Sequence, residues 1–528
     1  MDHTSSSSDS IRSSSNSTRS HQSHSSPSPQ PQPLSQDNMS TSLQANVQEL
    51  QQRFENCDDI VFREIPGPES PRFAVVYANG MCNMSELDEL VIDRLNRMTG
   101  LVPSAEDLRS QLAISSIHTE CCFEDAAISI ASGNPLILIA GAEQGLVVSL
   151  AGMETRGIEE PSAETVVRGP REGFVEALMI NCSLLRRRLR SPLLKMEMMR
   201  FGRHTHTPVA LVYMEGIADE DLIKEARERL SRIKIDGLLD SSVVEEMLED
   251  APYSPFPQLM ATERPDVVNA SLLEGRFVVL VDGSPFALIA PISMFSLLQS
   301  PEDYYERAAL ATAIRWLRYL FVAIALTVPS IYVAVLSYHQ EMIPATLLFT
   351  IAESREHIPF PALIEALLME ITFEALREAG IRLPKQVGSA VSIVGALVIG
   401  QAAIAAGIVS SPMVMVVAIT GIASFMVPNF ALGGAIRLLR FPIMICSGIL
   451  GLYGLMVAII LILTHLLTLR SFGVPYLSPV APMMNQEWKD TLVRAPRWQM
   501  IMRPHLTGSR NRRRASEQMQ GKSRGRLH

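Results

Sequence analysis

The hydrophobic positions of this chain change their pattern near Arg318. Before that residue, short β-branched runs alternate with segments that have apolar residues at helical spacing, as in a soluble α/β protein. After it come four long apolar segments, each able to cross a hydrocarbon core of ~30 Å as a helix of ~20 residues. The pattern predicts an α/β soluble region followed by an all-α polytopic membrane domain. The apolar segments are Tyr319–Ser337, Gln386–Val409, Val414–Ile436 and Phe441–Leu469.

A repeated pattern divides the soluble region into two parts. Arg72–Leu95 and Thr207–Leu230 each read as a strand, a glycine-containing turn and an amphipathic helix with an acidic first turn. Asn134–Leu150 and Arg276–Ile289 each read as two strand-like runs around a glycine-bearing turn, which is the pattern of a β-hairpin. The counterparts lie about 140 residues apart. We therefore predict two related α/β subdomains.

The expected domain order follows from these patterns. It consists of a Ser/Pro-rich head over 1–42 that we expect to be disordered, a first α/β subdomain with its connector over 43–195, a second α/β subdomain over 205–295, a membrane domain over 302–482, and a basic tail over 483–528 that we also expect to be disordered. A helix over Glu302–Arg318 is expected to couple the second subdomain to the first membrane segment, because its aromatic and basic residues suit a water–lipid interface.

The connector carries a charged motif, VRGPREGF, over Val167–Phe174. Its Arg168, Arg171 and Glu172 surround a Gly-Pro pair and could bind an anion, or could satisfy one another and hold a turn. We favour the second interpretation and expect a structural motif between the subdomains. The chain contains no glycine-rich phosphate loop, HExxH motif or nucleophile elbow, so we expect neither catalysis nor a cofactor or metal.

A less regular segment, Met342–Gly380, separates the first two apolar segments and carries several carboxylates. Glu365, Glu370 and Glu374 are the intramembrane acidic candidates, because carboxylates at membrane depth are costly and line a water-filled path or pair with a partner. Glu374 has such a partner in Arg377, on the same side of a helix. We expect an interfacial or re-entrant helix here, which leaves the other four segments as complete crossings.

The second apolar segment has two unlike faces in a helical projection. One face consists of small residues, which let helices approach each other closely. The opposite face is a row of valines with one glutamine. It could line a pore that gates by dewetting, or it could face lipid with the glutamine bonded to a neighbouring helix, and the pattern alone leaves both open. The gate candidates on this face are Val391, Val394, Val398 and Gln401.

Charge and composition indicate on which side of the membrane each part of the chain lies. The formal net charge of −9 over 528 residues combines the soluble region with the membrane domain, so it says little by itself. The chain starts with Ser, Pro, Gln and Asn rather than with a signal peptide, and its tail is strongly basic. We therefore expect the soluble region and the tail on the cytoplasmic side, with the tail able to contact anionic lipid. Four basic residues, Arg382, Lys385, Arg437 and Arg440, would then lie outside, against the positive-inside trend.

Several motifs of this chain resemble those of one family. The motifs are, in chain order, VRGPREGF, TERPD, EDYY, SIVGALVIGQAA and LRSFGVPYLSP. Together they resemble the motifs of the A subunit of GerA-type spore germination receptors. The resemblance runs from about Leu43 to Pro482 and leaves out the Ser/Pro-rich head and the basic tail.

This resemblance implies a subunit of a nutrient receptor in the inner membrane of an endospore. In that family the A subunit works with a transporter-like B subunit and a lipoprotein C subunit, and A subunits are expected to form a ring whose membrane part is a nutrient-opened cation channel. The resemblance therefore favours the pore-lining interpretation of the valine face. The alternatives are a secondary transporter coupled through Glu365 or Glu370, and a structural scaffold for the other subunits. No nucleic-acid partner is expected.

Overall fold

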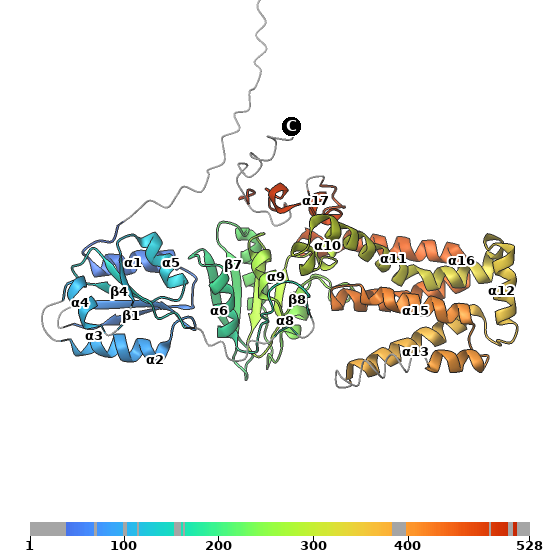
Figure 1. Ribbon diagram of the computed structural model, residues 1–528, viewed down its shortest axis with the longest axis horizontal. Coiled ribbons are helices and arrows are strands. Elements are labelled where there is room, and N and C mark those ends of the chain that lie inside the picture. The colour runs from blue at the N-terminus through green and yellow to red at the C-terminus, as the bar shows by residue number, and fades with distance from the viewer. Residues whose placement is uncertain are drawn as a thin grey trace, which may run out of the picture.

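The computed structural model shows two α/β subdomains followed by a bundle of long helices, one after another along the longest axis of the molecule (Figure 1). This arrangement confirms the predicted fold class. The described residues are 38–67, 71–98, 103–112, 114, 116–152, 160–161, 164–382, 398–484, 487–504 and 511–514.

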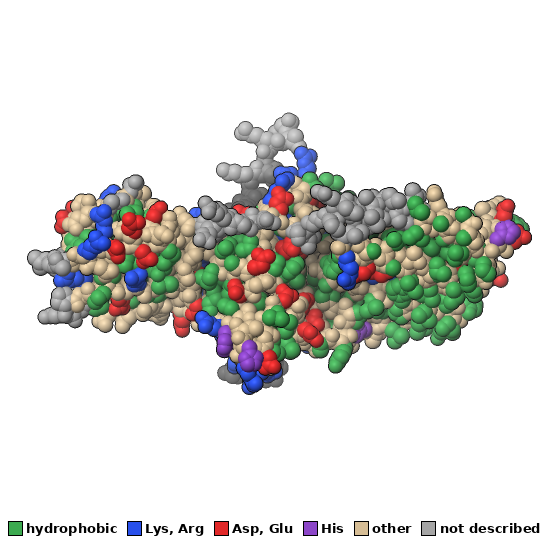
Figure 2. Space-filling view, turned by 90° about the horizontal axis from the view of Figure 1, so that it is seen from below, with side chains coloured by type: hydrophobic (Ala, Val, Ile, Leu, Met, Phe, Trp, Pro, Cys, Tyr) green, Lys and Arg blue, Asp and Glu red, His purple; other side chains and the backbone are tan. Residues whose placement is uncertain are grey.

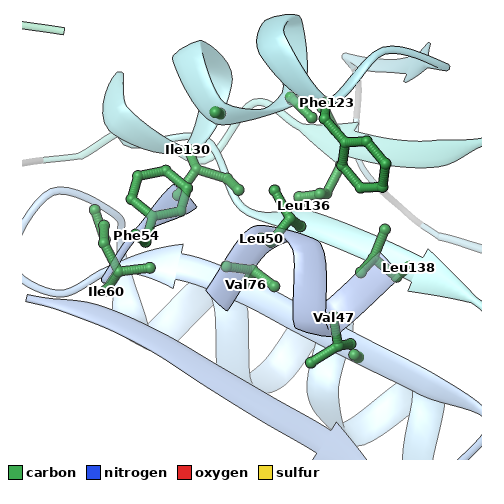
Figure 3. Close-up of a cluster of buried hydrophobic side chains, with 14 of the residues drawn as sticks. Val47, Leu50, Phe54, Ile60, Val76, Phe123, Ile130, Leu136 and Leu138 are labelled. Carbon is green, nitrogen blue, oxygen red and sulfur yellow. The ribbon is translucent and has the colours of Figure 1, made fainter. Parts of the chain in front are cut away.

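Subdomain one is an antiparallel sheet with helices on both faces. Its elements are α1 (Leu43–Arg53), β1 (Ile60–Ile65), β2 (Phe73–Ala78), α2 (Met84–Glu86), a π-helical turn (Leu87–Ile92), α3 (Asp93–Arg97), α4 (Ala105–Gln111), β3 (Ile117–Glu120), α5 (Phe123–Ala131), β4 (Leu136–Ile139) and β5 (Gly145–Val148). The strand order is β1-β2-β4-β5-β3. Side chains of β2 alternate between the faces, as a strand requires. Val76 packs with α1 and α5 (Figure 3), whereas Val75 packs with α3 and α4.

Subdomain two repeats this plan. Its elements are α6 (Leu178–Arg188), β6 (Leu194–Phe201), β7 (Thr207–Met214), α7 (Glu220–Ser231), α8 (Ser241–Leu248), β8 (Met260–Thr262), α9 (Pro265–Leu272), β9 (Phe277–Val281) and β10 (Ala287–Ala290). The strand order β6-β7-β9-β10-β8 matches that of subdomain one position by position. Both predicted hairpins form, as β4–β5 and β9–β10. The predicted relation between the subdomains is therefore confirmed by an identical sheet topology.

Subdomain two begins earlier than the predicted start at 205. α6 and β6 belong to its core, because Leu178 of α6 and Leu194 of β6 pack with Ala210 of β7. The basic end of α6 lies within 43–195, the range that we had assigned to subdomain one and its connector. Arg186 is fully buried, and its Nε lies 2.5 Å from Oδ2 of Asp59 in subdomain one. A buried and paired arginine has the same sequence signature as a surface arginine, which explains the misplaced boundary.

The bundle contains the long apolar helices. It consists of α11 (Ala308–Tyr338), α12 (Ala345–Arg355), α13 (Ala362–Arg382), a helical stretch over 398–405, α15 (Ser411–Phe425) and α16 (Phe430–Thr468). Among the described residues, α11 and α16 are long and apolar enough to cross a membrane, with mean hydropathies of 2.2 and 2.5. Hydrophobic side chains cover this end of the molecule, whereas charged side chains gather over the subdomains (Figure 2).

The element α16 is two helices joined at Gly451. The backbone of Gly451, with φ 64° and ψ −146°, lies in a region that only glycine adopts readily. The arms on either side, 430–450 and 452–468, run back along each other, because Ile443 packs against Leu455. Tyr338 at the end of α11 also touches Gly451. The glycine therefore marks the end of the bundle that is farthest from the subdomains, which we call the far end.

Two predicted membrane segments are wrong because apolar runs continue through turns. Phe441–Leu469 combines parts of both arms of α16. Val414–Ile436 is divided, since α15 ends at Phe425 and α16 begins at Phe430. Pro428 lies in this break and has no N–H with which to continue a helix. Half of Gln386–Val409, residues 386–397, lies outside the described residues.

Part of the tail that we expected to be disordered is folded. Residues 487–504 contain α17 (Trp488–Thr491) and a 3-10 turn over Arg497–Gln499. Thr491 and Arg494 are buried. The prediction was wrong because it used the composition of the whole tail, which is basic, whereas one short segment within the tail packs on the base of α11.

Candidate functional site

The first membrane helix joins subdomain two at the EDYY motif, Glu302–Tyr305. The continuous helix expected over Glu302–Arg318 is broken here. A 3-10 turn spans Pro301–Tyr304, and α11 starts only at Ala308. Because the helix is broken, the four EDYY side chains point in different directions and contact different partners. We call these four residues and their direct partners the EDYY joint.

Asp303 anchors the base of α11 in this joint. Its buried carboxylate accepts from Arg315 Nε at 3.2 Å and from Arg318 Nη1 at 3.0 Å. Both guanidinium groups are buried. The arginines that we expected at the lipid interface therefore turn inward, and they fix the first turns of α11 to the EDYY joint.

The outer residues of EDYY hold the connector. Glu302 Oε1 accepts the Val167 N–H at 2.7 Å, and the Tyr305 hydroxyl donates to Asp266 Oδ2 at 2.5 Å. A Cβ at Gly169 would lie 2.8 Å from the Tyr305 ring, so glycine allows the connector to lie against it. Burial and the Asp266 carboxylate raise the pKa of Tyr305 to about 12. The phenol therefore stays protonated at neutral pH and can donate.

The VRGPREGF motif thus lies between the EDYY joint and α6 of subdomain two. Glu172 accepts hydrogen bonds from two arginines of α6, one of them Arg188 at 2.7 Å. Partial burial acts to raise the pKa of Glu172, but these guanidinium groups lower it overall. Arg171 Nη1 lies 3.1 Å from Glu160 Oε1, and Arg168 is exposed. The three predicted motif residues are close in the chain, but the bonds of Arg171 and Glu172 go to other partners.

The last membrane helix is fastened to the same subdomain through Phe472. This phenylalanine is buried in the subdomain core, with its ring centroid 4.9 Å from that of Phe277 in an edge-on arrangement. Its N–H donates to Asp250 Oδ2 at 2.7 Å, and Arg229 Cζ lies 4.2 Å from the ring centroid. Subdomain two therefore holds both ends of the bundle.

The helix α13 brings two acidic candidates against α16. Glu370 Oε2 lies 2.5 Å from Arg440 Nη1, and both side chains are buried. Glu374 contacts Arg377, and its Oε1 lies 3.3 Å from Arg437 Nε. α13 packs against α11, α15 and α16. It is therefore a packed member of the bundle.

The position of Arg437 in the bundle follows from the packing of α16. The arm of α16 that carries Arg437 begins beside the subdomains, because Leu432 and Ala435 pack with Phe256 and Leu297. Arg437 thus belongs to the subdomain end of the bundle and is paired within it.

Glu365 lies toward the far end and caps α15. It is fully buried, and its Oε1 accepts the N–H of Ser410 at 2.6 Å and the hydroxyl of the same residue. Ser410 is the N-cap of α15. The other carboxylate oxygen lies 3.5 Å from Arg355 Nη2. A carboxylate at this position satisfies donors that a helix N-terminus leaves free, which is a structural role.

The gate candidates are only partly within the described residues, because Val391 and Val394 lie outside them. Val398 is 56% exposed, and Gln401 is exposed as well. On the opposite side of the same stretch Gly400 is buried, and a Cβ there would lie 3.5 Å from Val414. At these positions the small face points into the bundle and the valine–glutamine face points out.

Asp303, Asp490 and Phe472 were not singled out from the sequence. Asp490 accepts from the Tyr304 hydroxyl at 2.9 Å and contacts Arg315. One signal was available, since Asp490 and Glu517 are the two acidic residues after Trp488 in a strongly basic tail. Phe472 stands alone between polar residues in RSFG, where nothing local indicates burial in a distant core.

Comparison with known proteins identifies the family. A family model described as Bacillus/Clostridium GerA spore germination protein matches residues 48–506. The chain is 47% identical over 468 residues to the uncharacterized membrane protein YfkQ of Bacillus subtilis (strain 168), covering 88% of this chain and 91% of that protein. It is 46% identical over 471 residues to spore germination protein KA of the same strain, covering 88% and 87%.

A solved structure also shows similarity. It is the N-terminal domain of the A subunit of the Bacillus megaterium spore germinant receptor GerK3, which is 32% identical, covers 48% of this chain and 96% of that chain, and has a TM-score of 0.37. The family is one of receptors, which confirms the expectation that the chain is not an enzyme. This membrane protein therefore belongs to the GerA family of spore germination receptors, as an A subunit.

Proposed function

We propose that this A subunit acts in a nutrient germinant receptor that triggers spore germination, and that copies of it assemble around a nutrient-gated ion channel. Its proposed partners are a transporter-like B subunit, a lipoprotein C subunit and further copies of the A subunit. The proposed location is the inner membrane of the spore, with the soluble region and the tail on the cytoplasmic side.

The channel proposal rests on the helical stretch 398–405, which packs in the bundle on one side and is exposed on the other. Ala403 packs with Met413 inside the bundle, whereas Val398 is 56% exposed and Gln401 is exposed too. A glutamine facing lipid would leave its amide groups without partners. An uncovered face with a glutamine beside a valine therefore suits a pore axis or a neighbouring copy better than lipid.

The two attachments to subdomain two support gating by movement. α11 is held through Asp303 and α16 through Phe472, so a rotation of subdomain two shifts the first and last helices of the bundle together. The chain also enters and leaves the bundle at this subdomain. An even number of crossings follows, which supports placing the soluble region and the tail on one side.

The contacts of Glu365 argue against a transporter. Its carboxylate is committed to the cap of α15 and lies near Arg355. A coupling carboxylate has to exchange a proton or cation during transport, and a buried structural cap is poorly placed for that.

The test replaces the exposed valine. Val398→Ser in the purified A subunit, reconstituted in liposomes, should raise ion leak without nutrient about tenfold, because a hydroxyl at a hydrophobic constriction favours wetting. Ile422→Ser is the matched control, since Ile422 is 62% exposed on α15. Equal leak from both variants would contradict the valine gate. Absence of any flux from the wild-type subunit with its partners and nutrient would favour the scaffold alternative.

A further inference from the structure

A short C-terminal segment is laid against the base of the first membrane helix. Its residues 487–494 run beside α11, and we call them the C-terminal strap. The Trp316 indole N–H donates to the Leu492 carbonyl at 2.7 Å, and the Tyr319 hydroxyl donates to the Thr491 carbonyl at 2.6 Å. Both bonds use main-chain carbonyl groups of the strap. They therefore fix the backbone of the strap on α11 and do not depend on the strap's own side chains.

Two further hydrogen bonds join the strap to α11. The Arg494 N–H donates to Thr312 Oγ1 at 3.2 Å, and Arg315 Nη1 donates to Asp490 Oδ1 at 3.4 Å. The α11 residues in contact are thus 312, 315, 316 and 319, which share one face of a helix. The strap follows this face over two turns.

The strap also binds the EDYY joint. Arg494 Nε donates to the Asp303 carbonyl at 3.0 Å, and Asp490 accepts from the Tyr304 hydroxyl at 2.9 Å. Gln299, just before the motif, donates its side-chain N–H to the Asp490 carbonyl at 2.9 Å. The strap is therefore bonded on one side to the membrane helix and on the other to the turn that connects this helix to subdomain two.

We propose that the C-terminal strap is a positioning element that sets the direction in which α11 leaves subdomain two, and that channel opening requires the strap to shift. The second half of this statement rests on the proposed channel function, and the first half does not. A turn of few residues between two rigid bodies allows their angle to vary. The Asp303 ion pairs already limit this freedom, and a third segment bonded to both the helix and the turn limits it further. Movement of such a segment changes the angle without unfolding either body.

The chain carries a natural reporter for this region. Its three tryptophans are Trp316 on α11, Trp488 in the strap, and Trp498 just beyond it. In a Trp488→Phe/Trp498→Phe background, fluorescence reports Trp316 alone in the full-length protein.

The first experiment compares two truncations in this background. One ends at Gln486 and removes the strap, and the matched control ends at Arg514 and keeps it. Without the strap, quenching of Trp316 by acrylamide and hydrogen exchange in the first turns of α11 should each rise severalfold, to about tenfold for exchange. The control should match the full chain. Equal values for both truncations would overturn the positioning role. Unchanged exchange in β7 and β9 shows that subdomain two still folds.

The second experiment tests the shift in the full-length chain. Ala313→Cys/Val493→Cys places two thiols at exposed positions on either side of the contact, since Ala313 is exposed on α11 and Val493 is 45% exposed in the strap. The bonds of Trp316 and Tyr319 to the strap stay in place. A bifunctional methanethiosulfonate reagent links the pair, and a reductant releases it. The linked receptor should lose nutrient-triggered ion flux and regain it after reduction, while each single cysteine variant should be unaffected by the reagent.

These outcomes distinguish a failure of the strap proposal from a failure of the channel proposal. Full flux from the linked receptor would overturn the requirement for a shift. If the unlinked receptor conducts no ions at all, the channel proposal fails, and the truncation result alone then decides the positioning role.

Discussion

Arg186 joins the two subdomains through a buried ion pair with Asp59. Its guanidinium is fully buried and binds the Asp59 carboxylate at 2.5 and 2.8 Å, and it also donates to the Leu194 carbonyl at 3.1 Å. A charge at this depth is stable only while it is paired. Removal of either partner leaves the other as an uncompensated buried ion.

Arg186→Met should therefore destabilise the soluble region by ~3–5 kcal/mol, because Asp59 stays buried without its partner. Chemical denaturation of the full chain in detergent measures this as a lower midpoint. Arg190→Met changes an exposed arginine just beyond the same helix and should have little effect. Adding Asp59→Leu to Arg186→Met should restore much of the lost stability. A double variant as unstable as the single one would show that the ion pair is not the cause.

Glu245 makes the stability of subdomain two depend on pH. Burial raises its pKa to about 7, and repulsion from Glu249 and Asp240 acts in the same direction. Its ordinary pKa of 4.5 applies in the unfolded chain. Between these values the folded state holds a proton that the unfolded state has lost. The folded state is therefore favoured increasingly as pH falls from about 7 toward 4.5.

Glu245→Gln should consequently raise the denaturation midpoint at pH 8 and flatten its dependence between pH 8 and about 5. The measurement is the unfolding midpoint of the full chain in detergent as a function of pH. Glu246→Gln, at the exposed neighbouring position, should leave the wild-type pH dependence in place. A wild-type slope that persists in Glu245→Gln would assign the pH dependence to another group.

At the scale of elements, the turn at Gly451 determines how α16 is built. A side chain there is opposed twice, by the left-handed backbone with φ 64° and by the His339 ring, which lies 2.9 Å from the position of a Cβ. Tyr338 is in contact as well. The glycine therefore allows two helices to meet at a sharp turn and to touch the end of α11.

Gly451→Ala should destabilise the bundle by ~1–3 kcal/mol, because alanine adopts this backbone conformation only with strain. Thermal unfolding of the detergent-solubilised chain reports the loss. Gly434→Ala is the control, since Gly434 lies within the first arm of α16 and its Cβ would meet only the end of the Arg437 side chain, at 3.7 Å. There alanine should be neutral or slightly stabilising. Similar losses from both would mean that the turn is not strained.

The elements differ in how far their sequence predicts them. Strands such as β2 and β7 were predictable, because β-branched runs ending at a glycine turn are local signals. The exposed face with Val398 and Gln401 was also predictable, since helical periodicity is local. The hairpin in α16 was not, because its turn needs only one glycine inside a continuous apolar run. Glu370 and Arg440 are 70 residues apart, so no local pattern indicates their pairing.

At the scale of the whole molecule, subdomain two connects subdomain one to the helical bundle. It receives subdomain one through Arg186 and holds the bundle at Asp303 and Phe472. An input that rotates subdomain two therefore acts on both ends of the bundle at once. Cooperative unfolding of the subdomain and the bundle is expected while both attachments are intact.

Phe472→Ala should separate these two units. Loss of the buried ring costs ~3–5 kcal/mol and removes its contacts with Phe277 and Arg229. Calorimetry of the full chain in detergent should then show two transitions in place of one. Tyr253→Ala, at a fully exposed aromatic position of the same subdomain, should keep a single transition. One transition in Phe472→Ala would mean that the α11 attachment alone couples the units.

The repeated sheet also bears on how the soluble region could have grown. The outer edge of β6 is occupied by a turn of subdomain one, where the Met196 N–H donates to the Asn56 carbonyl at 3.0 Å. The equivalent edge of subdomain one is β1, whose Arg63 and Glu64 are exposed. In tandem arrays each unit covers the next, and polar residues close the terminal one. By this logic the soluble region is a two-unit array, and its charged first strand discourages the docking of a third unit.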